Sequence, residues 1–209
     1  MLLRLAQDPQ LFLIVAIAFV IAITLHEASH ALVATWLGDD LPRLQGRVTL
    51  NPLRHLDFLG TVMILIASFG WGRPVLVNPY RLRFGSHRGM ALVAAAGPAS
   101  NVALALVLAP VARELASGSG TDLITVAVVL IIQLNLFLAV FNLIPLPPLD
   151  GFSVLIGLVP RETANRLDGL RRYGPGLLIG LFLLIAFVPG ATGIISGPVL
   201  GATRLLLGG

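Results

Sequence analysis

The sequence predicts an all-α polytopic membrane protein with about four to six membrane segments and a short membrane-associated β-hairpin or sheet after the first helix. Hydrophobic residues make up 56% of the 209 residues, and charged residues only 11%. The mean hydropathy is +0.93, whereas a soluble domain is typically about 25% charged. We expect one integral-membrane domain over residues 1–209, with a core over 9–158 and C-terminal membrane segments over 175–207.

Composition also excludes several classes of site. The chain has no cysteine, so it has neither a disulfide nor a thiolate metal site. The net charge of +4 comes from arginines alone, and in a membrane protein these residues mark cytoplasmic loops. We therefore expect the lipid bilayer, and no nucleic acid, as the surroundings of this chain.

The first apolar stretch covers residues 9–37 and ends at Gly38. It is too long for a signal-peptide core and long enough to span a bilayer with tilt. His26 and His30 lie four residues apart within it, on one face of the expected helix, where two imidazoles can bind one metal ion. Glu27 lies beside them as a candidate general base. Because ionisable groups inside a membrane are costly, this cluster indicates function.

Residues 41–90 are expected to contain short strands and a short apolar stretch in place of a long membrane helix. Alternation around Val48 and Thr49 predicts a short strand followed by a turn, and residues 75–84 form a second strand-like stretch. Val48 and Thr49 are therefore candidates to pair with an extended substrate. The apolar stretch 58–71 is too short to cross the bilayer core as a helix, so it either dips in and returns or crosses in another form.

Two firm spans follow, over residues 90–111 and 123–144, and two apolar pieces over 177–188 and 192–207 close the chain. Arginines decide how these are oriented. If the first helix runs from outside to inside and residues 58–71 are re-entrant, eleven of the fourteen arginines lie inside. A full crossing by 58–71 would divide them between the two sides. We therefore expect a re-entrant segment and a site toward the cytoplasmic side of a prokaryotic cell membrane. The inside arginines are Arg43, Arg47, Arg54, Arg73, Arg81, Arg83, Arg88, Arg161, Arg166, Arg171 and Arg172.

In this topology Asp150 follows the inner end of span 123–144, at a depth similar to that of the two histidines. It is the favoured third metal ligand, although an aspartate there can also cap a helix, and Asp39, Asp40 and Asp57 are further acids on the same side. Asn101 and Asn142 lie within spans, where asparagines bond neighbouring helices or donate to a substrate carbonyl. Both roles remain open for each of them. We expect His55 and His87 to have surface or packing roles.

Four motifs, in this order, resemble the site-2 protease family, whose members are zinc metalloproteases that cut within the membrane. The resemblance implies one zinc ion per chain, held by His26, His30 and Asp150, with Glu27 as the catalytic glutamate. It also implies membrane-associated strands near residues 44–54 and a role for Asn142 in holding substrate. The motifs are His26-Glu27-Ala28-Ser29-His30, Gly46 with Asn51 to His55, Gly97 to Asn101, and Asn142 to Gly151.

The expected activity is hydrolysis of peptide bonds in a transmembrane-helix protein. The chain resembles a minimal member without PDZ or CBS domains, so gating would come from a separate regulatory membrane protein, the lipid or residues 56–90. The alternative function is a metal-binding transporter or channel that moves ions through the His26 and His30 cluster, and the third is a non-proteolytic scaffold. Glu27 favours the enzyme, while the substrate and the oligomeric state stay open.

Overall fold

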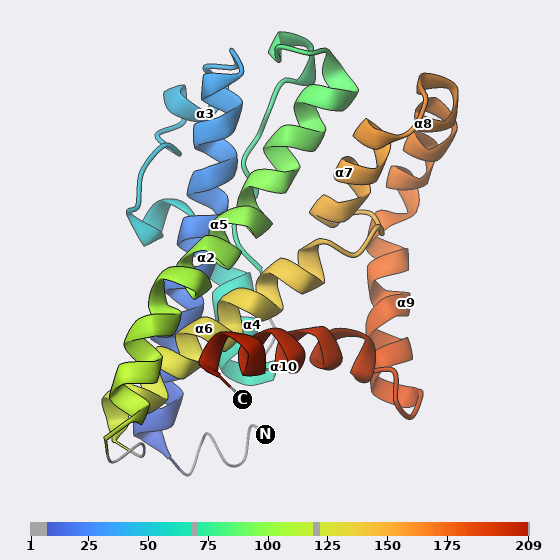
Figure 1. Ribbon diagram of the computed structural model, residues 1–209. Helices are drawn as coiled ribbons and strands as arrows, with labels where there is room; N and C mark the ends of the chain where they lie inside the picture. Colours follow the sequence, from blue (N-terminus) through green and yellow to red (C-terminus); the bar gives the residue numbers. More distant parts are fainter. Residues whose placement is uncertain (1–7, 68–70, 119–121, 209) are drawn as a thin grey trace.

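The computed structural model describes residues 8–67, 71–118 and 122–208, and the regular secondary structure within these ranges is helical, joined by turns and extended segments. Three helices, α2, α5 and α6, pack together as the centre of the molecule, and α10 lies across α5 and α6 (Figure 1). The α-helices are α2 (Pro9–Trp36), α3 (Leu41–Leu44), α4 (Phe58–Ala67), α5 (Ser86–Ala116), α6 (Leu123–Asn142), α7 (Asp150–Leu158), α8 (Arg161–Asp168), α9 (Gly174–Phe187) and α10 (Gly193–Leu207), and the short 3-10 helices are η1 (Pro52–Arg54), η2 (Pro79–Arg81) and η3 (Gly169–Tyr173).

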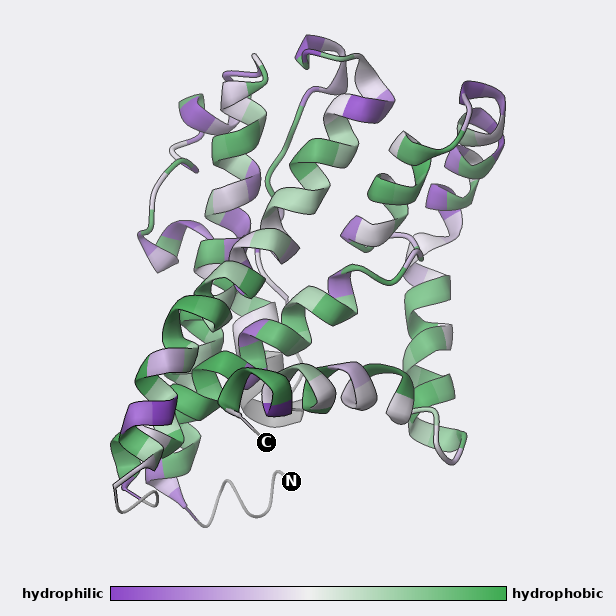
Figure 2. Ribbon diagram, viewed as in Figure 1, coloured by the Kyte–Doolittle hydropathy of each residue, from purple (hydrophilic) through white to green (hydrophobic). Residues whose placement is uncertain are grey.

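Four helical stretches in the described ranges are long and apolar enough to cross a membrane: α2, α5, α6 and the continuous stretch Arg161–Phe187. The ribbons of these helices consist largely of hydrophobic residues (Figure 2), and many of their large apolar side chains are exposed, as expected when lipid is the solvent. The chain is therefore a membrane protein. The expectation of several membrane helices is confirmed.

Local chemistry explains where the central helices begin. The Asp8 carboxylate accepts hydrogen bonds from the backbone N–H groups of Gln10 and Leu11, at 3.1 and 3.0 Å, ahead of Pro9 in the first turn of α2. Asp122 caps α6 in the same way through the Thr125 N–H, at 2.8 Å. Small buried residues on α2 let α5 approach it closely; they are Ala18, Ala22, Ala28, Ala31 and Ala34.

The predicted β-hairpin is wrong. Residues 45–51 form turns, and the described part of the chain contains no strand, only an isolated bridge between Leu56 and Gly72. The alternation of polar and apolar residues does not lead to a strand here. Arg47, a polar residue of that pattern, is buried, with 6% of its surface exposed, and its side chain bonds to backbone carbonyls. Its guanidinium donates to the carbonyls of Arg54, Arg73 and Pro74, which a β-ladder would otherwise engage.

Helix α4 lies in a segment that returns to where it started. The Arg73 N–H donates to the His55 carbonyl at 2.7 Å, beside the bridge between Leu56 and Gly72. A methyl group at Gly60 would overlap the Trp71 backbone, so the first turn of α4 touches the returning chain. Of the predicted stretch 58–71, residues 68–70 lie outside the described residues. The two ends meet, which agrees with a re-entrant segment and not with a crossing.

After this segment, residues 73–78 run extended between α2 and α5 toward the end of the bundle that carries α3, η2 and α8 (Figure 1). Arg47 holds one end of this extended segment, as described above. The buried Asp39 carboxylate holds the other end by accepting from the Asn78 N–H at 2.6 Å. The extended segment forms one wall of the cavity described next.

Candidate metal centre

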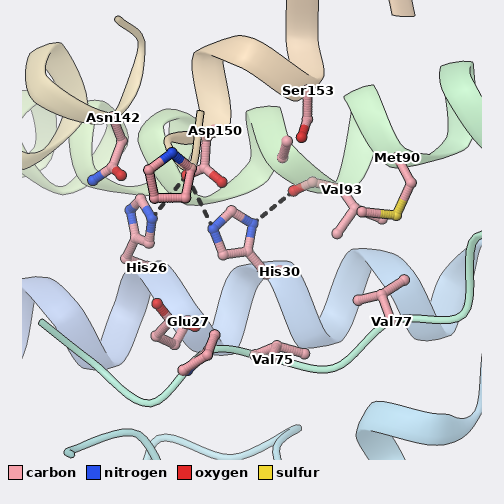
Figure 3. Close-up of a pocket in the computed structure, with 13 residues that line it drawn as sticks. His26, Glu27, His30, Val75, Val77, Met90, Val93, Asn142, Asp150 and Ser153 are labelled. Atoms are coloured by element: carbon pink, nitrogen blue, oxygen red, sulfur yellow. Dashed lines mark hydrogen bonds and ion pairs between the residues drawn. The ribbon is translucent and has the colours of Figure 1, made fainter. Parts of the chain in front are cut away.

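Two turns of α2 and the start of α7 bring three ligand-type side chains together. His26 and His30 are 4% and 8% exposed and project toward α5 and α7. The Oδ2 atom of Asp150, the first residue of α7, lies 3.0 Å from His26 Nε2 and 3.2 Å from His30 Nε2 (Figure 3). Their ligand atoms all lie within 4.8 Å of one another. The structure thus unites the three residues that the sequence singled out as metal ligands, although Asp150 is more than a hundred residues away.

The backbone of α5 passes directly over the two imidazoles at Gly97. A methyl group there would lie 2.5 Å from His30 Nε2 and 2.7 Å from His26 Cε1. Such contacts are far inside van der Waals separation, so only glycine fits. Gly97 therefore serves the close approach of α5 to the histidine helix.

The far nitrogen of each imidazole is fixed by an acceptor. His30 Nδ1 lies 2.7 Å from the Val93 carbonyl oxygen, and His26 Nδ1 lies 2.7 Å from Asn101 Oδ1. A carbonyl oxygen can only accept, so both Nδ1 atoms carry the proton and donate. Both Nε2 atoms consequently present a lone pair toward Asp150. Protein metal sites commonly orient their histidine ligands in this manner.

Asn101 is fully buried, and all of its polar groups are engaged within the protein. Its Nδ2 atom donates to the Ala22 carbonyl at 3.0 Å and to Asn135 Oδ1 at 2.7 Å, which leaves Oδ1 for His26. Of the two roles that the sequence left open for Asn101, these contacts support bonding to neighbouring helices: Asn101 orients His26 and has no polar group left for a substrate. Asn135, also fully buried, was missed by the sequence reasoning, although a lone asparagine within an apolar span was the same signal that drew attention to Asn101.

The donor set suits zinc. Three acceptor atoms, two imidazole nitrogens and a carboxylate oxygen, converge on one point, and they repel one another unless positive charge lies between them. Two histidines and one carboxylate are a known catalytic zinc set, which leaves one coordination position open.

The three residues line a cavity of about 210 Å³. Glu27, half-buried, also lines it, on the side of α2 that faces the extended segment carrying Val75 (Figure 3). Asn142 lies at the same cavity, and its amide donates to the Leu138 carbonyl one turn earlier at 3.0 Å. One N–H of that amide thus remains for a ligand in the cavity.

The other predicted residues lie elsewhere. Val48 and Thr49 do not line the metal cavity, and because no strand forms there, their predicted pairing with substrate is not supported. His55 is fully buried and donates through Nε2 to the Thr49 carbonyl at 2.8 Å, which is a packing role. His87 lines a neighbouring cavity.

Curated bacterial proteins are similar to this chain, among them the following three. A Bacillus subtilis protein named "Putative zinc metalloprotease YwhC" is 38% identical over 195 residues, which cover 90% of this chain and 86% of that protein. A Mycobacterium tuberculosis protein named "Putative zinc metalloprotease Rip2" is 32% identical, over 82% of this chain and 67% of its own. The Mycolicibacterium smegmatis protein of the same name is 30% identical, over 83% and 67%. No family model and no solved structure matches the chain.

Proposed function

The chain belongs to the site-2 protease family of zinc metalloproteases, and from this we propose that it hydrolyses peptide bonds within membrane-spanning segments of its protein substrates. One observation carries the proposal: His26, His30 and Asp150 converge in a cavity that Glu27 also lines, between helices long enough to span a membrane. A cavity so placed suits a substrate that is itself in the membrane. The names of the relatives favour a protease over a metal transporter.

Zinc, when bound, supplies Lewis-acid chemistry that polarises a water molecule and the scissile carbonyl and brings the pKa of the water to about 7. His26, His30 and Asp150 hold the ion, and the bonds to Nδ1 keep both imidazoles oriented toward it. The Glu27 carboxylate accepts the proton of the attacking water and later donates it to the departing amine. No covalent bond between the protein and the substrate is needed.

The substrate must be unwound around the cut, because a transmembrane helix bonds its backbone amides to one another. The free N–H of the Asn142 amide, at the edge of the cavity, is suited to donate to an exposed substrate carbonyl. This contact would favour the unwound form without any strand addition.

We also propose that the cavity faces the cytoplasmic side of the bacterial membrane. Arginines concentrate at the end of the bundle that carries α3, η2 and α8, toward which α2 runs with its two histidines in the later half (Figure 1). Such an excess of arginine marks the cytoplasmic side in membrane proteins.

The test compares the wild-type protein with Glu27→Gln, purified in detergent, against a panel of single-span membrane proteins. We expect the variant to keep its zinc and to lose cleavage by about a thousandfold or more, because it lacks only the general base. Zinc is measured by elemental analysis in both proteins. Zinc-loaded wild type that cuts none of the panel, or a variant that cuts as fast as wild type, would refute the proposal.

A further inference from the structure

A second cavity adjoins the metal cavity. It has a volume of about 240 Å³ and lies between the N-terminal turn of α5, α7 and η3. Three residues, Val77, Met90 and Ser153, line both cavities, and we call them the neck. Figure 3 shows all three beyond His30, on the side away from Asn142. The neck therefore borders both the metal cavity and the second cavity.

The second cavity has a polar wall. Arg171 donates through Nη2 to the Ser153 hydroxyl at 3.2 Å and through Nε to the Asp168 carboxylate at 2.6 Å, so a hydrogen-bonded chain runs from the neck outward. Ser86 and His87, in the first turn of α5, line the cavity as well. A lipid tail or a continuous apolar helix would offer no hydrogen-bond partner to Ser86 and His87, whereas a peptide backbone with polar side chains can bond to them.

The second cavity also opens outward at the arginine-rich end of the bundle. Tyr80, which lines it, is 90% exposed, and the Arg171 and Asp168 side chains are 42% and 50% exposed. The second cavity thus lies between the neck and the region that we expect to face the cytoplasm.

Size makes such an extension necessary for a peptide substrate. An extended chain advances about 3.3–3.6 Å per residue, and pockets that enclose a drug-sized ligand measure about 300–1,000 Å³. The metal cavity alone, at about 210 Å³, is smaller than that range. A peptide cut at the metal must therefore continue into space beyond it on at least one side.

We propose that the second cavity binds the residues immediately next to the cut, at the polar end of the substrate's membrane segment, and that the neck selects the side chain that passes it. This inference rests on the proposed function. It predicts that the scissile bond lies within about three residues of the polar end of the substrate span, because the neck directly follows the metal centre. Met90, an unbranched and adaptable side chain, is the neck residue best able to yield to a passing peptide.

The test uses the absence of native cysteine. His87→Cys, which lines the second cavity, and Arg161→Cys, exposed at the same end but outside both cavities, are each made in the Glu27→Gln background. The rate of labelling by a water-soluble maleimide is measured with and without a single-span membrane substrate. We expect the substrate to slow labelling at 87 by about tenfold and to leave labelling at 161 unchanged, because a bound peptide excludes the reagent.

A copurifying substrate that leaves the rate at 87 unchanged, or that slows both sites equally, would overturn the inference. A second measurement uses His87→Cys with Glu27 intact: labelling with a bulky maleimide should lower kcat/KM by about tenfold relative to the same unlabelled protein, without loss of zinc. An undiminished rate would also overturn it. The two hypotheses can fail separately. If the proposed function is wrong, unlabelled wild type cuts no substrate, whereas the labelling rate at position 87 still shows whether a substrate occupies the second cavity.

Discussion

Replacing Asn101 by alanine tests whether the buried asparagine network holds the metal centre. The change removes the acceptor for His26 Nδ1 and the donor for both the Ala22 carbonyl and Asn135 Oδ1. His26 then loses the bond that fixes its tautomer and ring orientation. Removal of such a partner typically lowers metal affinity by about 10–100-fold, which corresponds to about 1.4–2.7 kcal/mol.

The loss should also appear in stability. Asn101 is fully buried, so the two acceptors it leaves are out of reach of bulk water. Each unsatisfied buried group costs about 1–3 kcal/mol, and the free energy of unfolding should fall by that order. The affinity for zinc is measured by competition with a chromophoric chelator, in the protein that remains monodisperse in detergent.

Two variants separate positioning from general damage. Asn101→Asp keeps an acceptor for His26 Nδ1 but loses the donor to Ala22 and Asn135, so it should recover zinc affinity relative to Asn101→Ala without recovering the free energy of unfolding. Asn142→Ala lies at the cavity but bonds only its own helix, so it should leave zinc affinity unchanged and lower cleavage. Wild-type zinc affinity in folded Asn101→Ala would refute the reasoning.

Three further changes follow from the same geometry. Gly97→Ala would set a methyl group 2.5 Å from His30 Nε2, so zinc content by elemental analysis should fall well below one per chain; full content would contradict the close approach. Arg47→Met leaves three carbonyls without their donor and should lower the free energy of unfolding by about 1–3 kcal/mol for each carbonyl that water cannot reach, seen as earlier thermal unfolding in detergent with zinc retained. Removal of zinc with a chelator should abolish cleavage, and added zinc should restore it; activity that survives chelation would exclude a metal role.

The membrane helices and the histidine pair were predictable because both depend on neighbours in the chain. Apolar length gives the spans, and a spacing of four gives a shared helix face for His26 and His30. The position of Asp150 followed from the arginine distribution, which fixes the depth of distant segments without any contact being known. The re-entrant path predicted for residues 58–71 rested on their length and on the same distribution, and the contact between Leu56 and Gly72 agrees with it.

The strands were mispredicted because alternation in four residues does not say what the backbone will bond. The Arg47 guanidinium donates hydrogen bonds to three backbone carbonyls outside its own turn. The sequence around Arg47 does not indicate which carbonyls these are. In a β-ladder a partner strand bonds the backbone carbonyls. Here the buried Arg47 side chain bonds three of them instead.

By itself, the sequence determined a membrane protein with a metal-binding helix, because hydropathy and helical spacing are local properties. Only the tertiary structure decided which groups surround the amides of Asn101 and Asn142. Asn101 and Asn142 carry the same amide in similar apolar helices, yet one is closed off behind His26 and the other borders the cavity. The difference lies in which helix packs against each amide, and hydrogen-bond partners separated by dozens of residues are set by packing and not by local pattern.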